Sequence, residues 1–419
     1  MRAVSRVGEV APIDRDGAVG RGAPTAAASR TQVWIERLQL TDFRNYKSLS
    51  ISVGPAPVVL TGANGSGKTN LLEALSLLTS GQGLRRAPYP ELARVGAQRW
   101  AVAARLVTPL QAIDIGTGLA DVPDSDARRG SGRIVRIDGE TQSGSGVLAD
   151  HVDMVWLTPA MDGLFTGPAS DRRRFLDRLI AGFDPGYSPL VGKFERAMQQ
   201  RNRLLAEDVR DGARFAGLER IMADTGVAIA AARVVAVTEL SAAILARRDA
   251  GAGALFPWAE LALVGPLEAA LSAKPAIEVE DDYFAQLASG RERDRAAGRT
   301  LEGPHRSDLA VGHGPKELPA KVCSTGEQKA LLIGLLLAHC DLVCTRRDGA
   351  RPLLLLDEIT AHLDPSRRAA LFDEIVALGC QAWMSGTDVD AFSALAGRAQ
   401  FYRVEEARLA ALARGAPGT

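Results

Sequence analysis

The sequence predicts an α/β fold in which one domain is interrupted by a long, mainly helical insertion. Three observations lead to this prediction. An apolar strand, a glycine-rich loop and an apolar-periodic helix follow one another near residue 60. A second apolar strand, at 352–356, ends in two carboxylates. The stretch between these regions, from 170 to about 297, has mainly helical periodicity.

The order of the elements follows from their patterns, because apolar alternation or short apolar runs indicate strands and a 3.6-residue period indicates helices. The first part predicts strands at 33–40, 48–53 and 57–61, a helix at 70–78, and strands at 100–106, 113–119, 133–137 and 152–157. The helical stretch is broken near Pro185 and Phe256. The last part predicts a strand at 307–311, a helix at 325–343, a strand at 352–356, a helix at 366–378 and a strand at 381–384.

Composition limits the classes of protein to consider. The chain has 419 residues, of which 46% are hydrophobic and 24% charged, so we expect two or three domains or one large domain with an insertion. Fifty basic and fifty acidic residues exclude a uniformly basic coat for nucleic acid, although basic residues on one face could still bind it. Aromatic residues make up 5%, which argues against a large base-stacking platform.

Cysteine content and hydropathy predict a cytoplasmic protein without a membrane segment. The four cysteines are too few for a disulfide framework, so we expect reduced thiols. The longest apolar stretch, 227–246, contains Arg233 and Glu239 and predicts a long helix with a buried face. Residues 1–31 lack periodicity and predict a disordered extension or a start codon placed too early. The Gly/Ser/Asp-rich stretch 121–132 predicts a mobile loop.

A phosphate-binding loop is predicted at residues 62–69. The loop fits G-x-x-x-x-G-K-[ST] at every position and lies between a strand and a helix, so a glycine-rich turn that binds nothing is a weaker interpretation. Backbone N–H groups and the helix dipole attract phosphate, Lys68 adds positive charge near the β- and γ-phosphates, and Thr69 offers a hydroxyl to Mg²⁺. The predicted ATP-binding residues of this loop are Gly62, Ala63, Asn64, Gly65, Ser66, Gly67, Lys68 and Thr69.

A second half of the site is predicted at Asp357 and Glu358, which end the strand at 352–356. Ligands of parallel sheets bind at the carboxyl ends of strands. We therefore expect Asp357 to face the Mg²⁺ held by Thr69, and Glu358 to activate the attacking water as general base. Taken by themselves, Asp357 and Glu358 are explained equally well by a strand followed by an acidic turn. The presence of the phosphate loop favours the functional interpretation.

Two helix starts near the C-terminus have good structural explanations of their own. Ser324-Thr-Gly-Glu-Gln328 opens the helix at 325–343 with a capping box, yet it also offers a serine, a glycine and a helix N-terminus that suit a γ-phosphate. Asp364, followed by proline, is explained as an N-cap.

In this order, the phosphate loop, the 324–328 motif, Asp357-Glu358 and Ala-His-Leu-Asp at 361–364 resemble an ABC-type ATPase. The stretch 40–46, Leu-Thr-Asp-Phe-Arg-Asn-Tyr, resembles the branch shared with SMC proteins. Pro159, Gly-Pro-Ala-Ser-Asp-Arg-Arg-Arg-Phe-Leu-Asp at 167–177 and Gly-Pro-His-Arg-Ser-Asp at 303–308 resemble the RecF family of bacterial recombination mediators. The resemblance covers roughly 33–404. It departs at Ser307 and His362, where an acidic residue is commoner.

The resemblance implies an α/β, ABC-type P-loop ATPase head with a mainly helical inserted arm domain. The implied division is a disordered extension at 1–31, the head at 32–168 and 299–405, the arm at 169–298 and a tail at 406–419. The resemblance also implies that the serine motif of one subunit closes over nucleotide held by the other. It thereby adds Ser324, Gly326, Gln328 and Asp364 to the ATP-binding residues. Ser385 and Thr387 are the candidates for a γ-phosphate contact, with Thr387 counted as catalytic, although a turn at the end of a strand explains both equally well.

The activity implied by the resemblance is ATP-dependent DNA binding. RecF-like proteins dimerise on ATP, bind duplex, gapped or junction DNA, and help a RecR-type mediator to load RecA in recombinational repair, replication restart and the SOS response. The implied cofactors are ATP and Mg²⁺, held by Thr69 and Asp357, with weak DNA-stimulated hydrolysis.

A basic segment at 172–203 is the predicted DNA-binding region. Eight basic residues face three acidic ones there, in a chain of zero net charge. Charge alone leaves solvated helix faces equally open; the resemblance favours DNA. The predicted DNA-binding residues are Arg172, Arg173, Arg174, Lys193, Arg196, Arg201 and Arg203. Arg44 and Asn45 are expected near the nucleotide or DNA, and His305 and Arg306 either link the arm to the ATP site or merely form a turn.

Three other functions stay open at this stage. A transporter's nucleotide-binding subunit is disfavoured by the 256 residues between Lys68 and Ser324 and by the absence of a sensing histidine near Thr387. An ATP-gated scaffold, with incidental hydrolysis, fits the same motifs. A GTPase is disfavoured because the sequence has no Asn-Lys-x-Asp motif.

Overall fold

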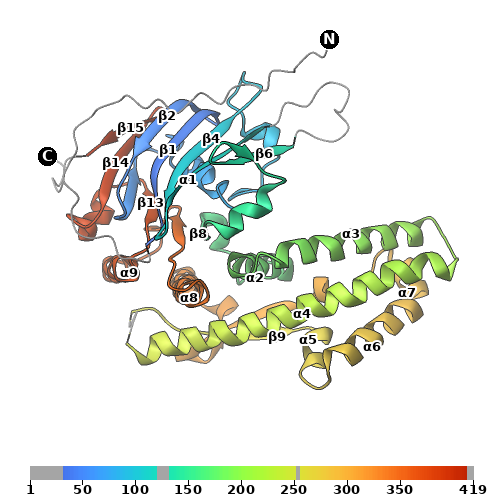
Figure 1. Ribbon diagram of the computed structural model, residues 1–419. Coiled ribbons are helices and arrows are strands. Elements are labelled where there is room, and N and C mark those ends of the chain that lie inside the picture. Colours follow the sequence, from blue (N-terminus) through green and yellow to red (C-terminus); the bar gives the residue numbers. More distant parts are fainter. Residues whose placement is uncertain (1–31, 120–131, 252–254, 413–419) are drawn as a thin grey trace, which may run out of the picture. The chain divides into compact units, whose positions relative to one another are not determined.

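The computed structural model describes residues 32–119, 132–251 and 255–412, which form two compact units (Figure 1). The sheet unit comprises the described residues up to 158 together with 348–361 and those from 371 onward. The helical unit comprises the described residues of 159–347 and 362–370. The extension expected at 1–31, most of the loop expected at 121–132 and the end of the expected tail lie outside the described residues.

Two six-stranded sheets build the sheet unit (Figure 1). The first is antiparallel, in the order β2 (Tyr46–Ser52), β1 (Trp34–Phe43), β4 (Ala101–Val107), β5 (Ala112–Leu119), β6 (Arg133–Ile137) and β7 (Glu140–Thr141). The second has the order β15 (Arg408–Ala411), β14 (Gln400–Glu405), β3 (Val58–Thr61), β13 (Ala382–Gly386), β12 (Leu353–Leu356) and β8 (Met154–Leu157). All its neighbouring pairs are parallel except β14 and β15.

The second sheet positions the candidate site. β3, β12 and β8 are buried at every residue, as expected of parallel strands covered on both faces. Helix α1 (Lys68–Ser76) packs against β12 and β13. Because β3, β13 and β12 are parallel neighbours, their carboxyl ends meet at one edge, where the phosphate loop and Asp357-Glu358 follow.

The helical unit is organised around one long helix, α4, against which α3, α6, α8 and β9 pack (Figure 1). Its short sheet is antiparallel, in the order β11, β10, β9. The helices are α2 (Ala169–Phe183), α3 (Tyr187–Ala206), α4 (Gly212–Asp249), α5 (Pro266–Leu271), α6 (Ala276–Ser289), α7 (Arg291–Ala297), α8 (Thr325–Arg346) and the first turns of α9 (Pro365–Leu378). The strands are β9 (Ala259–Val264), β10 (Asp308–His313) and β11 (Leu318–Pro319).

Two helices, α4 and α8, are long and apolar enough to span a membrane by length and composition alone. Within the protein, 78% of the apolar window of α8 and 44% of that of α4 is already buried. Core packing therefore accounts for most of the apolar surface of α8 and for much of that of α4, as the interrupted apolar stretch of α4 led us to expect.

The structure differs from the sequence prediction at several strands, including the two-residue strands β7 and β11, which were not predicted. β9 lies inside the stretch predicted as mainly helical; its residues Ala-Glu-Leu-Ala-Leu-Val favour a helix locally, but pairing with β10 overrides that preference. β14 was not predicted, and β15 lies within the expected tail. The helical unit also takes in β10 and α8, which the predicted division assigned to the head.

Candidate functional site

The phosphate loop of the sheet unit depends on glycine at its two ends. Gly62 has φ +146°, and a Cβ there would lie 2.3 Å from the Val404 carbonyl oxygen. Gly67 has φ +120°, and a Cβ would come within 2.8 Å of the Asn45 amide and the Tyr46 hydroxyl. These positions therefore require glycine, which lets the backbone turn from β3 into α1.

Lys68 and Thr69 begin α1 and face the strand ends. The buried Lys68 ammonium donates to the carbonyl oxygens of Gly62 (2.7 Å) and Ala63 (3.0 Å), and lies 3.8 Å from a Glu358 carboxylate oxygen. The Thr69 hydroxyl donates to Asp357 Oδ1 at 2.9 Å. The structure thus brings together the two halves of the site that the sequence predicted separately.

Ser385, on β13, completes a chain of hydrogen bonds around Asp357. Its hydroxyl donates to Asp357 Oδ1 at 2.6 Å and accepts from the Glu358 N–H at 2.9 Å. Glu358 has φ +49°, so the chain turns sharply after β12 while its side chain stays 27% exposed. Thr387, the predicted neighbour of Ser385, is exposed after the end of β13.

The oxygen donors at this edge suit Mg²⁺. A Mg²⁺ ion binds oxygens at about 2.1 Å in octahedral geometry, so adjacent ligands lie about 3 Å apart. The 2.9 Å separation of the Thr69 hydroxyl and Asp357 Oδ1 matches that spacing. No group of three or more His, Cys, Asp or Glu side chains suited to a metal occurs among the described residues.

Ser66 provides a second indication of an absent polar ligand. Its hydroxyl is buried in the phosphate loop and has no hydrogen-bond partner in the described part of the chain. Buried polar atoms are nearly always paired. An anion cradled by this loop would supply the missing partner.

Arg44 and Asn45 lie beside the phosphate loop, as expected, but Arg44 is already paired. Its guanidinium makes two 2.8 Å hydrogen bonds to the buried carboxylate of Glu73, in α1. The Asn45 amide donates to the Ser66 carbonyl oxygen at 3.2 Å. Their observed role is therefore to tie the turn after β1 to the phosphate loop and α1.

In the helical unit, Ser324 caps α8 through a complete capping box. The Ser324 hydroxyl accepts from the Glu327 N–H, and the Glu327 carboxylate accepts from the Ser324 N–H at 3.0 Å. Hydrogen bonds from Lys316, and then from Ser324, lower the pKa of the Glu327 carboxyl to about 2. Ser324 is nonetheless exposed, so its cap role leaves its outer side accessible.

The other predicted residues near this motif have distinct surroundings. A Cβ on Gly326 would lie 3.3 Å from the His362 carbonyl oxygen. Gln328 is buried and donates to the Cys323 carbonyl oxygen at 2.8 Å, which fixes the turn before α8. Asp364 caps α9 by accepting from the Arg367 N–H at 2.9 Å, as the sequence predicted.

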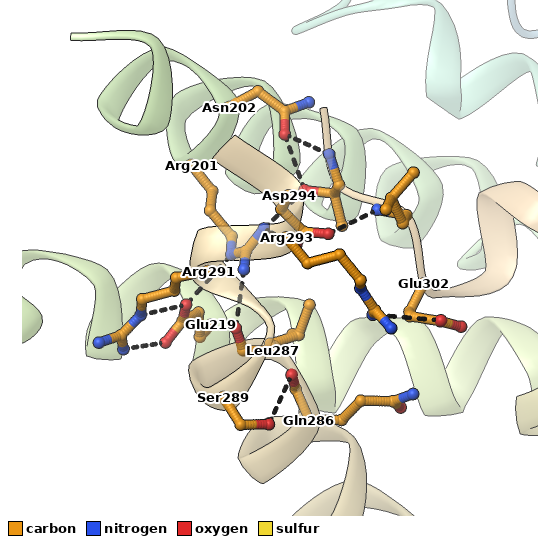
Figure 2. A network of polar contacts seen from close by, with 12 residues as sticks. Arg201, Asn202, Glu219, Gln286, Leu287, Ser289, Arg291, Arg293, Asp294 and Glu302 are labelled. Carbon is orange, nitrogen blue, oxygen red and sulfur yellow. Dashed lines mark hydrogen bonds and ion pairs between the residues drawn. The ribbon is translucent and has the colours of Figure 1, made fainter. Parts of the chain in front are cut away.

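Arg201 corrects the predicted DNA-binding set, because it is fully buried. It lies within a network of polar contacts (Figure 2). Its guanidinium donates to Glu219 (3.1 Å), Asp294 (2.7 Å), Thr300 Oγ1 (2.9 Å) and the Leu287 carbonyl oxygen (2.7 Å). The network ties α3 to α4, α6 and α7 and leaves no part of Arg201 for a DNA phosphate.

Arg172 and Arg173 are partly buried and bind residues at the start of β10. Arg172 makes two 2.8 Å hydrogen bonds to Asp308 and is 14% exposed. Arg173 donates to the Ser307 carbonyl oxygen, and burial lowers the pKa of its guanidinium. Both are held at the start of β10 but stay partly exposed, so their role as DNA contacts remains a prediction.

Four of the seven predicted residues remain on the surface. Arg174 is exposed beside Asp171, and Arg203, 79% exposed, pairs with Glu207 at 2.9 Å. Lys193 and Arg196 are exposed and form no ion pair within the described ranges. Positions 193, 196 and 203 share one face of α3 by their helical spacing.

A buried network around Ser307 contains residues that the sequence analysis missed. Ser307 donates to Glu268 at 2.6 Å, and Glu268 lies 3.8 Å from the guanidinium of Arg233. Asp177 binds Arg233 through two hydrogen bonds of 2.8 and 2.9 Å. Glu268 thus places a carboxylate next to Ser307, the position where the family more commonly has an acidic residue. No local sequence pattern indicates that Glu268 lies there.

His305 belongs to the turn before β10. Its Nε2 lies 3.1 Å from the Thr300 carbonyl oxygen, its ring lies 5.9 Å from that of Phe194, and burial lowers its pKa. This geometry favours the interpretation of a packed turn.

Comparisons with known proteins agree with this architecture. The family described as RecF/RecN/SMC N terminal domain matches residues 34–392. The DNA replication and repair protein RecF of Mesorhizobium japonicum is 54% identical over 375 residues, which make up 89% of this chain and 97% of that protein. The chain belongs to the RecF family. The RecF protein of Brucella suis biovar 1 is 50% identical over 380 residues, covering 90% and 96% of the two chains.

Solved structures show the same fold. The recombination mediator protein RecF-ATPrS in the RecFOR pathway aligns with a TM-score of 0.79 at 20% identity, covering 92% of this chain and 100% of that one. The Smc head domain derived from Pyrococcus furiosus aligns with a TM-score of 0.52 at 18% identity, covering 91% and 97%. The RecF fold, an ABC-type ATPase head with a helical insertion, is thereby confirmed for this chain.

Proposed function

We propose that this member of the RecF family is an ATP-dependent DNA-binding protein. It dimerises on ATP, binds duplex, gapped or junction DNA, and acts with a RecR-type mediator to help load RecA in recombinational repair and replication restart. The observation that carries the proposal is the hydrogen-bonded chain Thr69–Asp357–Ser385, which joins the phosphate-loop helix to two strand ends.

ATP binding rests on the phosphate loop. The backbone of residues 62–67 surrounds the phosphates, Ser66 supplies a buried hydroxyl without another partner, and Lys68 turns from the Gly62 and Ala63 carbonyls to the β- and γ-phosphates. Thr69 and Asp357 would hold Mg²⁺, which when bound neutralises phosphate charge.

Hydrolysis rests on Glu358. Its carboxylate follows Asp357 at the strand edge and is part-exposed, so it can orient a water and accept its proton. Ser385 fixes the Glu358 backbone and the Asp357 carboxylate together. Thr387, exposed at the end of β13, remains the predicted γ-phosphate contact.

Closure of two subunits rests on Ser324. Its hydroxyl and the start of α8 form an exposed donor group that can cover a γ-phosphate held by the phosphate loop of a second subunit. Gly326 and Asp364 flank this group, and Gln328 holds its turn from within. The dimer then presents a DNA-binding surface that depends on ATP.

DNA binding rests on the exposed cations of α2 and α3. Arg174, Lys193, Arg196 and Arg203 offer charge to phosphates without reading bases. The four cysteines all lie in the described part of the chain and are not joined by disulfide bonds, in keeping with a reducing cytoplasm.

The proposal is tested by ATP turnover of the wild type and Glu358→Gln, with and without duplex DNA. We expect weak wild-type turnover that DNA stimulates, and retained ATP binding without turnover in Glu358→Gln. Turnover that is unaffected by DNA, together with ATP-dependent DNA binding, would instead support an ATP-gated scaffold. Wild-type turnover in Glu358→Gln would exclude Glu358 as the base.

A further inference from the structure

A cavity of about 440 Å³ lies in the helical unit, between the C-terminal end of α4 and the first turns of α8. Ile244, Phe256 and Leu337 give it an apolar lining. Its volume is typical of pockets that take a small ligand or a few residues of a peptide. None of the residues assigned above to ATP or DNA lines it.

Four basic side chains line the rim of this cavity, and each is paired with a carboxylate: Arg247 with Asp341, Arg248 with Asp249, Lys316 with Glu327 and Arg367 with Asp364. Arg247, Arg248, Lys316 and Arg367 contribute four positive charges, whereas Glu327 is the one carboxylate among its described lining residues. The side chains of Arg248 and Lys316 are 40% and 49% exposed. Because exposed ion pairs are weak, both cations can exchange their present partners, Asp249 and Glu327, for the carboxylates of a ligand.

His313 points independently to a ligand. Its ring lines the cavity and is 4% exposed, yet Nδ1 has no hydrogen-bond partner among the residues that the structure describes. Buried polar atoms are nearly always satisfied, so an unpaired ring nitrogen at a cavity wall marks a place where a ligand atom can bind.

The polar groups of the lining select the ligand class. Apart from the cations, Glu327 and His313, the described lining holds only apolar side chains, proline, glycine and Trp258, with no hydroxyl or carboxamide. The carboxamides of Asn and Gln, which read adenine through a pair of hydrogen bonds, are therefore missing from the described lining. Trp258 also has the Arg248 guanidinium 5.4 Å from its ring centre and Gly314 packed close against the indole, which leaves little room for stacking.

We propose that this cavity binds an acidic peptide segment of a partner protein. A bulky apolar side chain enters among Ile244, Phe256 and Leu337, while flanking carboxylates pair with Arg248, Lys316 and Arg367. A backbone group of the peptide satisfies His313 Nδ1. This site needs neither nucleotide nor DNA, so its failure would leave the proposed ATP-dependent function untouched.

The test uses fluorescein-labelled hexapeptides of the form Asp-Glu-X-X-Asp-Glu, with X as Leu, Ile, Phe or Trp, added to the full chain without nucleotide. We expect fluorescence anisotropy to detect saturable binding of at least one of them. Arg248→Glu and Lys316→Glu should each weaken that binding at least tenfold. Arg214→Glu, an exposed charge reversal on α4 away from the cavity, should leave it unchanged.

Three results would overturn the proposal. The first is no saturable binding of any of these peptides. The second is equal binding of Asp-Glu-Ser-Ser-Asp-Glu, which would reduce the site to a general anion site. The third is competition by deoxynucleoside monophosphates at lower concentrations than the peptide, which would assign the cavity to nucleotides. His313→Ala checks the proposed backbone contact separately: it should weaken peptide binding without changing the rim charge, and unchanged binding would remove His313 from the site.

Discussion

The phosphate-loop edge of the sheet unit and the basic segment of the helical unit differ in how well their sequence motifs predict the positions of the side chains. At the sheet edge, Lys68, Thr69, Asp357 and Glu358 all lie where their motifs predict. In the basic segment, three of the six predicted arginines bind carboxylates or carbonyl oxygens of the helical unit, and one of them, Arg201, is fully buried. A strand end fixes the direction of the next residue, whereas charge along a helix says nothing about which side is buried.

The difference teaches that arginine count is a poor guide to a binding surface in a helical unit with a polar interior. Arg201 and Arg203 are two residues apart on α3, yet one is fully buried and the other is 79% exposed. Substitutions at such pairs separate structural from functional cations.

The largest effect on stability is expected from Arg201→Met. This change removes the centre of the network in Figure 2 and leaves the buried carboxylate of Asp294 without its ion pair. Breaking a buried pair costs about 3–5 kcal/mol. Urea unfolding followed by circular dichroism should show this loss, whereas Arg203→Met should change the free energy of unfolding by less than about 1 kcal/mol. Equal losses in the free energy of unfolding for Arg201→Met and Arg203→Met would contradict the assignment of Arg201 as a buried structural cation.

Lys68→Ala should produce the largest effect on ATP affinity. Removing one partner of a buried, hydrogen-bonded charge pair costs about 2–5 kcal/mol, or roughly 30-fold to several thousand-fold in Kd. Isothermal titration with ATP measures this loss. As a control, Lys193→Ala removes one positive charge from α3 and should bind ATP like the wild type. Wild-type ATP affinity in Lys68→Ala would show that Lys68 does not contribute to ATP binding.

Charge reversal on α3 should weaken DNA binding by an intermediate amount. The double variant Lys193→Glu and Arg196→Glu loses two exposed cations, so the log–log salt slope should flatten by about 0.9 for each lost phosphate contact. The control is Arg214→Glu with Arg299→Glu, which makes the same change in charge at exposed positions elsewhere in the helical unit. If both variants keep the wild-type slope, the basic face of α3 is only a solvated surface.

The smallest effect on folding is expected from Ser324→Asp. Aspartate caps helices about as well as serine, so the free energy of unfolding should change by less than about 0.5 kcal/mol. Titration with ATP should also give near-normal affinity, because the phosphate loop is unchanged. A large loss of stability would mean that the aspartate is repelled by the Glu327 carboxylate, which forms the other half of the capping box.

Much of the sheet edge and of the caps was predictable from sequence because those features are local. The loop 62–69, the capping box at Ser324 and Glu327, and the Asp364 cap are each confirmed as structural elements within a few residues of chain. The nucleotide and DNA roles of these residues stay predictions until the variants above are measured.

The features that could not be predicted from the sequence depend on contacts between residues far apart in the chain. Ser385 binds Asp357 across 28 positions, and Glu268 binds Ser307 across 39, so neither pairing leaves a local pattern. β9 is a strand only because β10 pairs with it. Arg201 is buried because Glu219 and Asp294, from two other helices, provide carboxylates inside the helical unit.

The most direct test of the central claim is sedimentation velocity of Glu358→Gln with ATP, compared with the same protein carrying Ser324→Asp as well. The claim is that ATP on the phosphate loop of one subunit is covered by Ser324 of another. We predict a dimer for Glu358→Gln with ATP but not with ADP, and a monomer for the double variant although it still binds ATP. A double variant that dimerises with ATP as fully as Glu358→Gln would leave Ser324 as a helix cap alone and contradict the account.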